Sequence, residues 1–335
     1  MSRIFITGGS GFIGTAIVRL ARQAGHEVCI YDLVAPGIVE HRAWWIEGDV
    51  RDLPALRQAA EAFEPDYFMH LASDIDVSIV DLKEFKTTID GTRNALAVAA
   101  TLPIKRFLHT STQFVVKPGI EPLNERHLDP YTVYGEAKAV AEQLVWDADL
   151  PMPWVMVRPV IIWGPGHPSF ADQIFRHIAT GKYLHPSGRT INRAFGYVEN
   201  VAEQMLLLAT MPADRTDRHI FYVGDGQIDY DIWADAFSNA LTGRRARRIP
   251  AALLLTLGKI GDLVKSVGIP SPIDGGRAFR MTTSSRVDLA PTIAITGTPR
   301  VSFDAGVLET LAWLREVDPV RFAGHGMNKG SDTTS

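Results

Sequence analysis

The sequence predicts an α/β fold built on a doubly wound parallel sheet. Short β-rich segments alternate with helical patterns through the first half of the chain, and a glycine-rich turn follows the first strand. Strands such as residues 154–157 are apolar on both faces. Regular alternation implies βαβ units with parallel strands. Strands apolar on both faces suit a sheet that helices cover on both sides.

The elements of the first half follow in order. Strands are expected at residues 3–7, 26–32, 44–47, 67–71, 106–110 and 154–158. Helices are expected between them at 14–24, 53–62, 85–100 and 133–146. Gly25 would close the first helix, as a glycine at a helix C-terminus does.

The pattern changes after Arg158-Pro159, where residues 164–168 form a turn-rich break. Beyond it the sequence predicts a helix at 174–179, an irregular stretch at 182–192, a strand and helix over 197–211 and a strand at 219–223. Later helices are expected at 230–241, 251–267 and 307–316. The polar end, residues 323–335, is predicted to be disordered.

Bulk properties set bounds on the function. The 335 residues are 46% hydrophobic and 21% charged, enough for one large or two modest cores. The formal charge of −4 argues against nucleic acid as the main partner. We recognise no secretory signal, no apolar run long enough for membrane insertion and no metal-ligand set. The single cysteine, Cys29, fits a reducing compartment, so a cytoplasmic protein is expected.

The glycine-rich turn has the pattern of a dinucleotide-binding site. It runs between the first strand and first helix and contains Gly8, Gly11, Phe12, Ile13 and Gly14. The first glycine permits a tight turn, the second lets the backbone approach a pyrophosphate, and the third lets the helix pack against the strand. Helix N-terminal N–H groups would then face the phosphates. The predicted sheet is therefore of the Rossmann type.

Acidic residues after the next strands define the expected cofactor. Asp32 would accept hydrogen bonds from a ribose 2′-hydroxyl and repel a 2′-phosphate, so NAD is predicted rather than NADP. A surface carboxylate at a turn is the alternative for Asp32. Asp49, followed by Val50, could meet the adenine, or could belong to a turn or cap beside Asp52 and Pro54.

Tyr134 and Lys138 are the candidate acid/base pair. At a spacing of four residues, both side chains would lie on one helix face, one turn apart. A free tyrosine has a pKa of about 10. The ammonium would stabilise the phenolate, so that the phenol can exchange protons nearer neutrality.

Together these residues resemble the extended short-chain dehydrogenase/reductase family, which includes NAD-dependent nucleotide-sugar epimerases, dehydratases and reductases. The resemblance extends to about Leu314. Besides the residues above, its carriers are His70-Leu71-Ala72-Ser73, Thr110-Ser111-Thr112, Arg158-Pro159, Trp163-Gly164-Pro165-Gly166 and Tyr197-Val198-Glu199-Asn200-Val201-Ala202.

The resemblance implies further site residues. Thr112, three residues before Val115, would hydrogen-bond the substrate oxygen, with Ser111 as the rival hydroxyl. Lys138 would also hold the nicotinamide ribose. Substrate contacts are implied for Gln113, Arg193 and Arg277, with Arg280 in reserve, and the cofactor would be lined by Leu71, Ala72 and Ser73. An arginine fork suits a diphosphate because it binds two oxygens at once.

Departures from the family pattern narrow the reaction. Gln113 and Phe114 stand where family dehydratases carry Asp-Glu, so 4,6-dehydration is not expected. Thr88 replaces an Asn common in sugar epimerases, and the segment at Asp288 departs from the family's Asp-x-Ser-Lys. The C-terminal Val301-Ser302-Phe303 is similar to that of the 3β-hydroxysteroid dehydrogenase branch. The basic residues Arg244, Arg245, Arg247 and Arg248 fit a solvated face or an anionic partner.

The sequence thus predicts an NAD-binding Rossmann domain, residues 1–163 and 197–223, with a smaller, mixed substrate-binding domain, residues 164–196 and 224–322. The expected activity is a nucleotide-sugar 4-epimerase working through a 4-keto intermediate. An NAD(P)-dependent nucleotide-sugar 4-ketoreductase or dehydrogenase, a 3β-hydroxysteroid dehydrogenase-like enzyme and a non-catalytic NAD-binding regulator are the alternatives. By resemblance, a homodimer would form through helices 85–100 and 133–146.

Overall fold

The described part of the chain divides into two compact units. The structure is a computed structural model that describes residues 1–76, 79–266, 268–269, 271 and 273–322. The first unit comprises Met1–Ile162, Gly196–Asp225 and Val287–Arg300. The second comprises Trp163–Phe195, Gly226–Arg286 and, within the described residues, 301–322. The predicted disorder of residues 323–335 falls outside the described residues.

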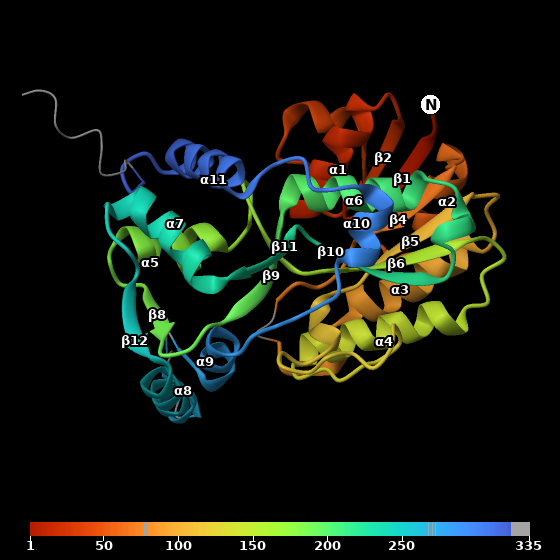
Figure 1. Ribbon diagram of the computed structural model, residues 1–335. Helices are drawn as coiled ribbons and strands as arrows, with labels where there is room; N and C mark the ends of the chain where they lie inside the picture. The colour runs from red at the N-terminus through yellow and green to blue at the C-terminus, as the bar shows by residue number, and fades with distance from the viewer. Residues whose placement is uncertain (77–78, 267, 270, 272, 323–335) are drawn as a thin grey trace, which may run out of the picture. The chain divides into compact units, whose positions relative to one another are not determined.

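A parallel sheet forms the centre of the first unit (Figure 1). Within the described residues it has seven strands in the order β10-β6-β5-β4-β1-β2-β3. Their bounds are β1 (Arg3–Thr7), β2 (Glu27–Asp32), β3 (Trp45–Glu47), β4 (Tyr67–His70), β5 (Arg106–Thr110), β6 (Trp154–Pro159) and β10 (His219–Val223). The order reverses between β1 and β4, and ligands bind at such a switch point in open α/β sheets. The predicted doubly wound parallel fold is confirmed.

Helices cover both faces of this sheet. On one face α1 (Phe12–Gln23) packs against α6 (Val198–Thr210), with α10 (Ala290–Thr296) beside α6 (Figure 1). The other face carries α2 (Leu53–Phe63), α3 (Lys86–Ala99) and α4 (Val133–Asp147). Phe5, Phe68 and Phe107 from the strands pack there in one apolar cluster with Leu56 of α2 and Val145 of α4. This cluster packs the helices against the sheet.

The second unit is mixed. Strand β11 (Gly226–Asp229) pairs antiparallel with β9 (Asn192–Tyr197). The short strand β7 (Ile161–Trp163) contains the boundary between the residues of the two units. The helices of the second unit are α5 (Arg176–Ala179), α7 (Tyr230–Thr242), α8 (Ala251–Ser266), α9 (Gly275–Thr282) and α11 (Phe303–Val317). Strands β8 (Leu184–Ser187) and β12 (Arg247–Pro250) form a parallel pair. The irregular stretch expected at 182–192 was therefore wrong, since Pro186 in β8 disguised a short strand.

The segment Val287–Arg300 packs in the first unit, whereas the sequence placed it in the second domain. Its helix α10 is anchored by Thr292 Oγ1, which donates to the Tyr222 carbonyl of β10 at 2.6 Å. Arg300 adds an ion pair with Glu203 of α6 at 3.0 Å. A polar contact between distant segments leaves no periodic signal in the sequence, which explains the difference.

A buried ion pair joins α4 to β6. Arg158 donates from Nε and Nη2 to the two carboxylate oxygens of Glu142, at 2.9 and 2.7 Å, and both side chains are fully buried. Ser111 Oγ donates to the same carboxylate at 2.5 Å, and Arg158 Nη1 donates to Tyr222 Oη at 3.2 Å. Breaking a buried pair by removing one partner leaves an uncompensated charge.

Replacing this arginine should strongly destabilise the fold. We expect Arg158→Leu to lower the free energy of unfolding by about 3–5 kcal/mol, because Glu142 would stay buried without its cation. Chemical denaturation measures this value. Arg93→Ala removes the exposed pair with Asp90 and serves as the control, with an expected loss below about 1 kcal/mol. Equal, small losses in both variants would contradict the prediction.

Candidate active site

The glycine-rich turn after β1 is packed against the loop that follows β4. Gly8 has a φ of +74°, and a Cβ there would lie 2.6 Å from the backbone nitrogen of Ala72. A Cβ on Gly14 would lie 2.4 Å from the Gly8 carbonyl oxygen. Leu71 N donates to the Thr7 carbonyl at 3.0 Å. The predicted cofactor residues Gly8, Gly11, Phe12, Ile13, Gly14, Leu71 and Ala72 are therefore brought together.

The start of α1 fits a dinucleotide pyrophosphate. Gly11 is the N-cap and brings no side chain, and the first turn, all of it described, contains no acidic residue. The N-terminal N–H groups and the helix dipole favour an anion at this position. The close backbone contacts leave no space for side chains at the turn, so a phosphate can approach the main chain.

Asp32 lies at the end of β2 beside this turn. Its Oδ2 accepts from Ser10 N at 3.0 Å and its Oδ1 accepts from Val34 N at 3.1 Å. These bonds fix the carboxylate next to the glycine turn, where the sequence predicts a ribose contact. The assignment to the ribose stays a prediction.

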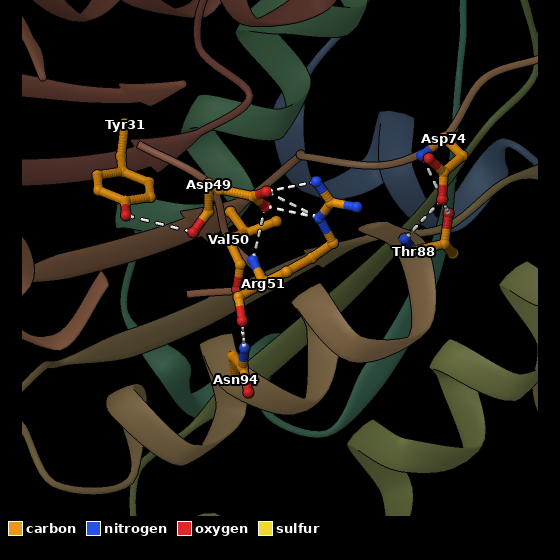
Figure 2. Close-up of polar contacts among 7 residues, drawn as sticks. All are labelled: Tyr31, Asp49, Val50, Arg51, Asp74, Thr88 and Asn94. Atoms are coloured by element: carbon orange, nitrogen blue, oxygen red, sulfur yellow. Dashed lines mark hydrogen bonds and ion pairs between the residues drawn. The ribbon is translucent and has the colours of Figure 1, made fainter. Parts of the chain in front are cut away.

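Asp49 is held by an arginine that the sequence reasoning missed. Arg51 donates to the Asp49 carboxylate from Nε at 2.8 Å and from Nη2 at 2.5 Å (Figure 2). This guanidinium holds the pKa of the Asp49 carboxyl below its usual range. Tyr31 Oη donates to the Asp49 carbonyl and Asn94 Nδ2 to the Val50 carbonyl. The adenine contact predicted for Asp49 would thus have to be made beside a cation.

Thr88, the replacement for the family's Asn, bonds to the loop after β4. Its N–H donates to Asp74 Oδ2 at 3.0 Å (Figure 2). Its Oγ1 lies 2.9 Å from Ser73 Oγ. Asp74 thereby accepts a hydrogen bond from the first turn of α3, whose N-cap, Phe85, has no capping side chain. The predicted cofactor residue Ser73 is fixed by the same contacts.

Tyr134, Lys138 and the end of β5 come together on one face of α4. Thr112 is hydrogen-bonded to the Tyr134 hydroxyl. Lys138 Nζ donates to the Thr110 carbonyl at 3.0 Å. Ser111 bonds to Glu142 instead, so the geometry favours Thr112 as the hydroxyl beside the phenol. Glu142 was not predicted, although its position four residues after Lys138 places it on the same helix face.

Burial shifts the pKa values of Tyr134 and Lys138 in the directions that favour their neutral forms. It raises the pKa of Tyr134 to about 12, and the hydrogen bond from Thr112 opposes the rise. Burial also lowers the pKa of Lys138 to about 8, and the negative charges of Asp74 and Glu142 oppose that shift. Both shifts follow from desolvation, which disfavours a charged group. The rings of Phe85 and Phe114, each 6.3 Å from that of Tyr134, contribute to the dry surroundings.

The predicted substrate residues lie in both units. Gln113 is buried in the first unit, directly after Thr112. Arg193 is buried on β9 of the second unit, with its guanidinium 4.4 Å from the ring centroid of Tyr230. Arg277 lies in the first turns of α9 and donates to the Gln173 carbonyl at 3.3 Å. Positive charges of Arg193 and Arg277 both act on the buried hydroxyl of Tyr183, although burial holds its pKa well above the usual value.

The described residues contain neither a candidate metal cluster nor a candidate membrane span. No group of three or more His, Cys, Asp or Glu side chains there could hold a metal ion. None of the helices in the same ranges has the length and apolarity needed to traverse a bilayer.

Comparison with known proteins adds a family match. The NAD dependent epimerase/dehydratase family model matches residues 4–224. A 3-beta-hydroxysteroid dehydrogenase of Mycolicibacterium neoaurum is 27% identical over 246 residues, which cover 68% of this chain and 66% of that protein. A ketoreductase of Stigmatella aurantiaca, acting on a farnesyl-dihydroquinoline oxide, is 30% identical over 62% of this chain and 64% of its own. The chain thus spans just under two-thirds of the length of these relatives.

A solved structure matches the fold over nearly the whole chain. UDP-glucose 4-epimerase of Thermotoga maritima, solved with UDP-glucose, superposes with a TM-score of 0.73. The match covers 94% of this chain and 99% of that one, at 20% sequence identity. At that identity the likeness concerns the fold alone.

Enlarging Gly14 should disturb the phosphate-binding turn. We expect Gly14→Ala to weaken NAD binding by about tenfold or more, because its Cβ would meet the Gly8 carbonyl and displace backbone. Calorimetric titration with NAD measures the affinity. Gly37→Ala is the matched control, since a Cβ there meets nothing within 4 Å. An unchanged affinity in Gly14→Ala would contradict this assignment of the turn.

The lowered pKa of Lys138 predicts a pH-dependent stability. Its folded pKa of about 8 lies below the usual unfolded value of about 10.4. Between these values the unfolded state binds more protons, so this group makes stability rise with pH. We expect Lys138→Met to gain stability relative to the parent protein at pH 7 and to lose that gain by pH 10. Thermal unfolding at both pH values measures the difference, and a gain that grows with pH would refute the shift.

Proposed function

The chain belongs to the NAD-dependent epimerase/dehydratase family and is an NAD-dependent enzyme of the extended short-chain dehydrogenase/reductase type, and from this we propose that it is a nucleotide-sugar 4-epimerase. The observation that carries the choice of substrate is the pair Arg193 and Arg277. Both cations belong to the second unit, where Arg193 lies on β9 against the Tyr230 ring and Arg277 lies at the start of α9. A diphosphate is the ligand that such a pair suits.

The residues of the first unit account for the proton transfer. Tyr134 would take the proton of the sugar 4-hydroxyl and return it after the ketone is reduced from its other face. Thr112, hydrogen-bonded to the phenol, would share the same substrate oxygen. Lys138 lies one helical turn away, and its ammonium lowers the cost of forming a phenolate whose pKa burial has raised. When bound, NAD supplies the reversible exchange of a hydride with the sugar carbon.

The residues beside the hydroxyls support epimerisation over dehydration. Elimination of water needs an acid and a base next to the ketone. Gln113 and Phe114 follow Thr112, and neither side chain can transfer a proton as a carboxyl group does. A 4-ketoreductase or dehydrogenase would use the same residues, and differs in releasing its cofactor after each turnover.

A second candidate is an apolar secondary alcohol, as in a 3β-hydroxysteroid dehydrogenase. The rings of Phe114 and Tyr131 contact each other next to Tyr134, with centroids 6.0 Å apart, and would suit an apolar ring system. The 3-beta-hydroxysteroid dehydrogenase relative favours it too. This substrate would leave Arg193 and Arg277 without a phosphate to bind. A regulator without activity is disfavoured, since Tyr134 and Lys138 are both present.

We also propose a homodimer through α3 and α4, by resemblance to the extended family. This pairing would place the helix that carries Tyr134 and Lys138 at a subunit interface.

Tyr134→Phe tests the catalytic assignment. Removing only the hydroxyl should reduce turnover by at least about a hundredfold, the usual contribution of a general acid/base. NAD affinity should change little, since the ring and the glycine turn remain. Phe114→Leu is the control for lost packing beside the phenol. Retention of activity by Tyr134→Phe would refute the role of the phenol.

Product analysis tests the substrate. The protein is incubated with UDP-, dTDP- and GDP-sugars, and products are identified by mass and chromatography. Conversion to the 4-epimer without change in mass and without net NADH is the expected result. Net NADH formation would indicate a dehydrogenase. Turnover of a 3β-hydroxysteroid and of none of the sugar nucleotides would overturn the proposal.

A further inference from the structure

A connected row of polar side chains lies beneath Arg193 in the second unit. Tyr230 Oη is 2.9 Å from Tyr183 Oη, and Tyr183 Oη is 3.2 Å from His185 Nδ1. His185 Nε2 lies 2.8 Å from a carboxylate oxygen of Asp231. The row starts at half-exposed Asp231 and ends at the Tyr230 ring, on whose face the Arg193 guanidinium rests. No part of the proposed mechanism uses it.

The hydroxyl of Tyr230 is tied to two further buried side chains. Burial lowers the pKa of His185 to about 4, so its ring is neutral near pH 7. A neutral imidazole has one donor and one acceptor nitrogen, so Nδ1 can pair with Tyr183 Oη in either direction. Tyr183 Oη pairs in turn with Tyr230 Oη. These contacts restrict the orientation of the Tyr230 ring.

The row also limits the positions that Arg193 can take. The strand that carries Arg193 pairs with β11, where Ile228 is its partner, and Tyr230 N donates to the Ile191 carbonyl at 2.8 Å. Tyr230 and Arg193 are therefore fixed to each other through backbone as well as through side chains. The Arg193 guanidinium lies 4.4 Å from the centroid of the Tyr230 ring, so this ring restricts where the cation can lie.

We propose that Tyr230, held by Tyr183 and His185, is a positioning residue that presents Arg193 to a diphosphate of the substrate and so contributes to specificity for nucleoside diphosphates. This inference rests on the proposed function, since it assigns Arg193 to the substrate's phosphates. Loss of the ring should weaken diphosphate binding through Arg193, and should raise KM more than it lowers kcat, because the diphosphate is remote from the reacting carbon.

A double-mutant cycle separates this role from packing. UDP, dTDP and GDP affinities are measured by calorimetry for the parent protein, Tyr230→Leu, Arg193→Ala and the double variant. Phe237→Leu, a second buried aromatic on α7 that packs on Phe175, is the matched control. NAD affinity and the thermal midpoint of every variant report on the fold.

We expect Tyr230→Leu to weaken nucleotide binding about tenfold, as the loss of a buried cation–π contact would. Phe237→Leu should stay within about twofold, and Tyr230→Leu should cause no further loss when Arg193 is already alanine. Tyr230→Phe, which keeps the ring, should bind more tightly than Tyr230→Leu.

Two outcomes overturn the proposal, and they are distinct. In the first, the parent protein binds a nucleoside diphosphate, but Tyr230→Leu binds it as tightly as Phe237→Leu does, or the effects of Tyr230→Leu and Arg193→Ala on affinity are additive. Tyr230 then does not act through Arg193, and the proposed function survives. If the parent protein binds NAD but none of the three diphosphates, the proposed function fails and this inference fails with it.

Discussion

A ladder of polar contacts between the end of β5 and one face of α4 is the constraint on which the candidate active site depends. Successive turns of α4 present Tyr134, Lys138 and Glu142, which bond to Thr112, the Thr110 carbonyl and Ser111. The Glu142 carboxylate in the Ser111 contact is also held by β6, because Arg158 donates to both of its oxygens. The charges that fix the helix thus lie directly beneath the residues that would carry out proton transfer, in a dry interior where each charge needs its partner.

The cofactor-binding turn depends on a different constraint, namely glycines at positions where a side chain would collide with neighbouring atoms. Gly8 contacts the backbone of Ala72, and Gly14 contacts Gly8, so that two loops and a helix start meet at main-chain distance. Gly91 allows α3 to approach Val50 in the same manner, since a Cβ there would lie 2.6 Å from that side chain. Close backbone approach provides N–H groups for phosphates without desolvating any buried charge. It also explains why glycines occupy positions within these elements that alanine would otherwise stabilise.

The alcohol–ketone chemistry that we propose for the first unit does not depend on the molecule to which the alcohol belongs. The curated relatives are named for a steroid and a farnesylated quinoline, and the structural neighbour for a sugar nucleotide. The proposed roles of Tyr134, Lys138 and Thr112 would serve a secondary alcohol in any of these settings. Discrimination between substrates must therefore come from other residues. In the second unit, the positive charge of Arg193, which lies over the Tyr230 ring, would favour a diphosphate over an apolar skeleton.

The sequence by itself determined the parallel sheet, since apolar runs predict the bounds of strands such as β1 and β5. Helical periodicity likewise places Tyr134 and Lys138 on one face of a helix. It also located the glycine turn, because glycine requirements are local. The short strands β8 and β12 escaped notice because each contains a proline. Only the tertiary structure decided that Ser111 belongs to Glu142, that Arg51 binds Asp49, that α10 packs with the first unit and that Tyr230 lies under Arg193. Periodicity records which face of an element is buried, whereas the partner of a buried polar group comes from a distant segment and is fixed only when the segments meet.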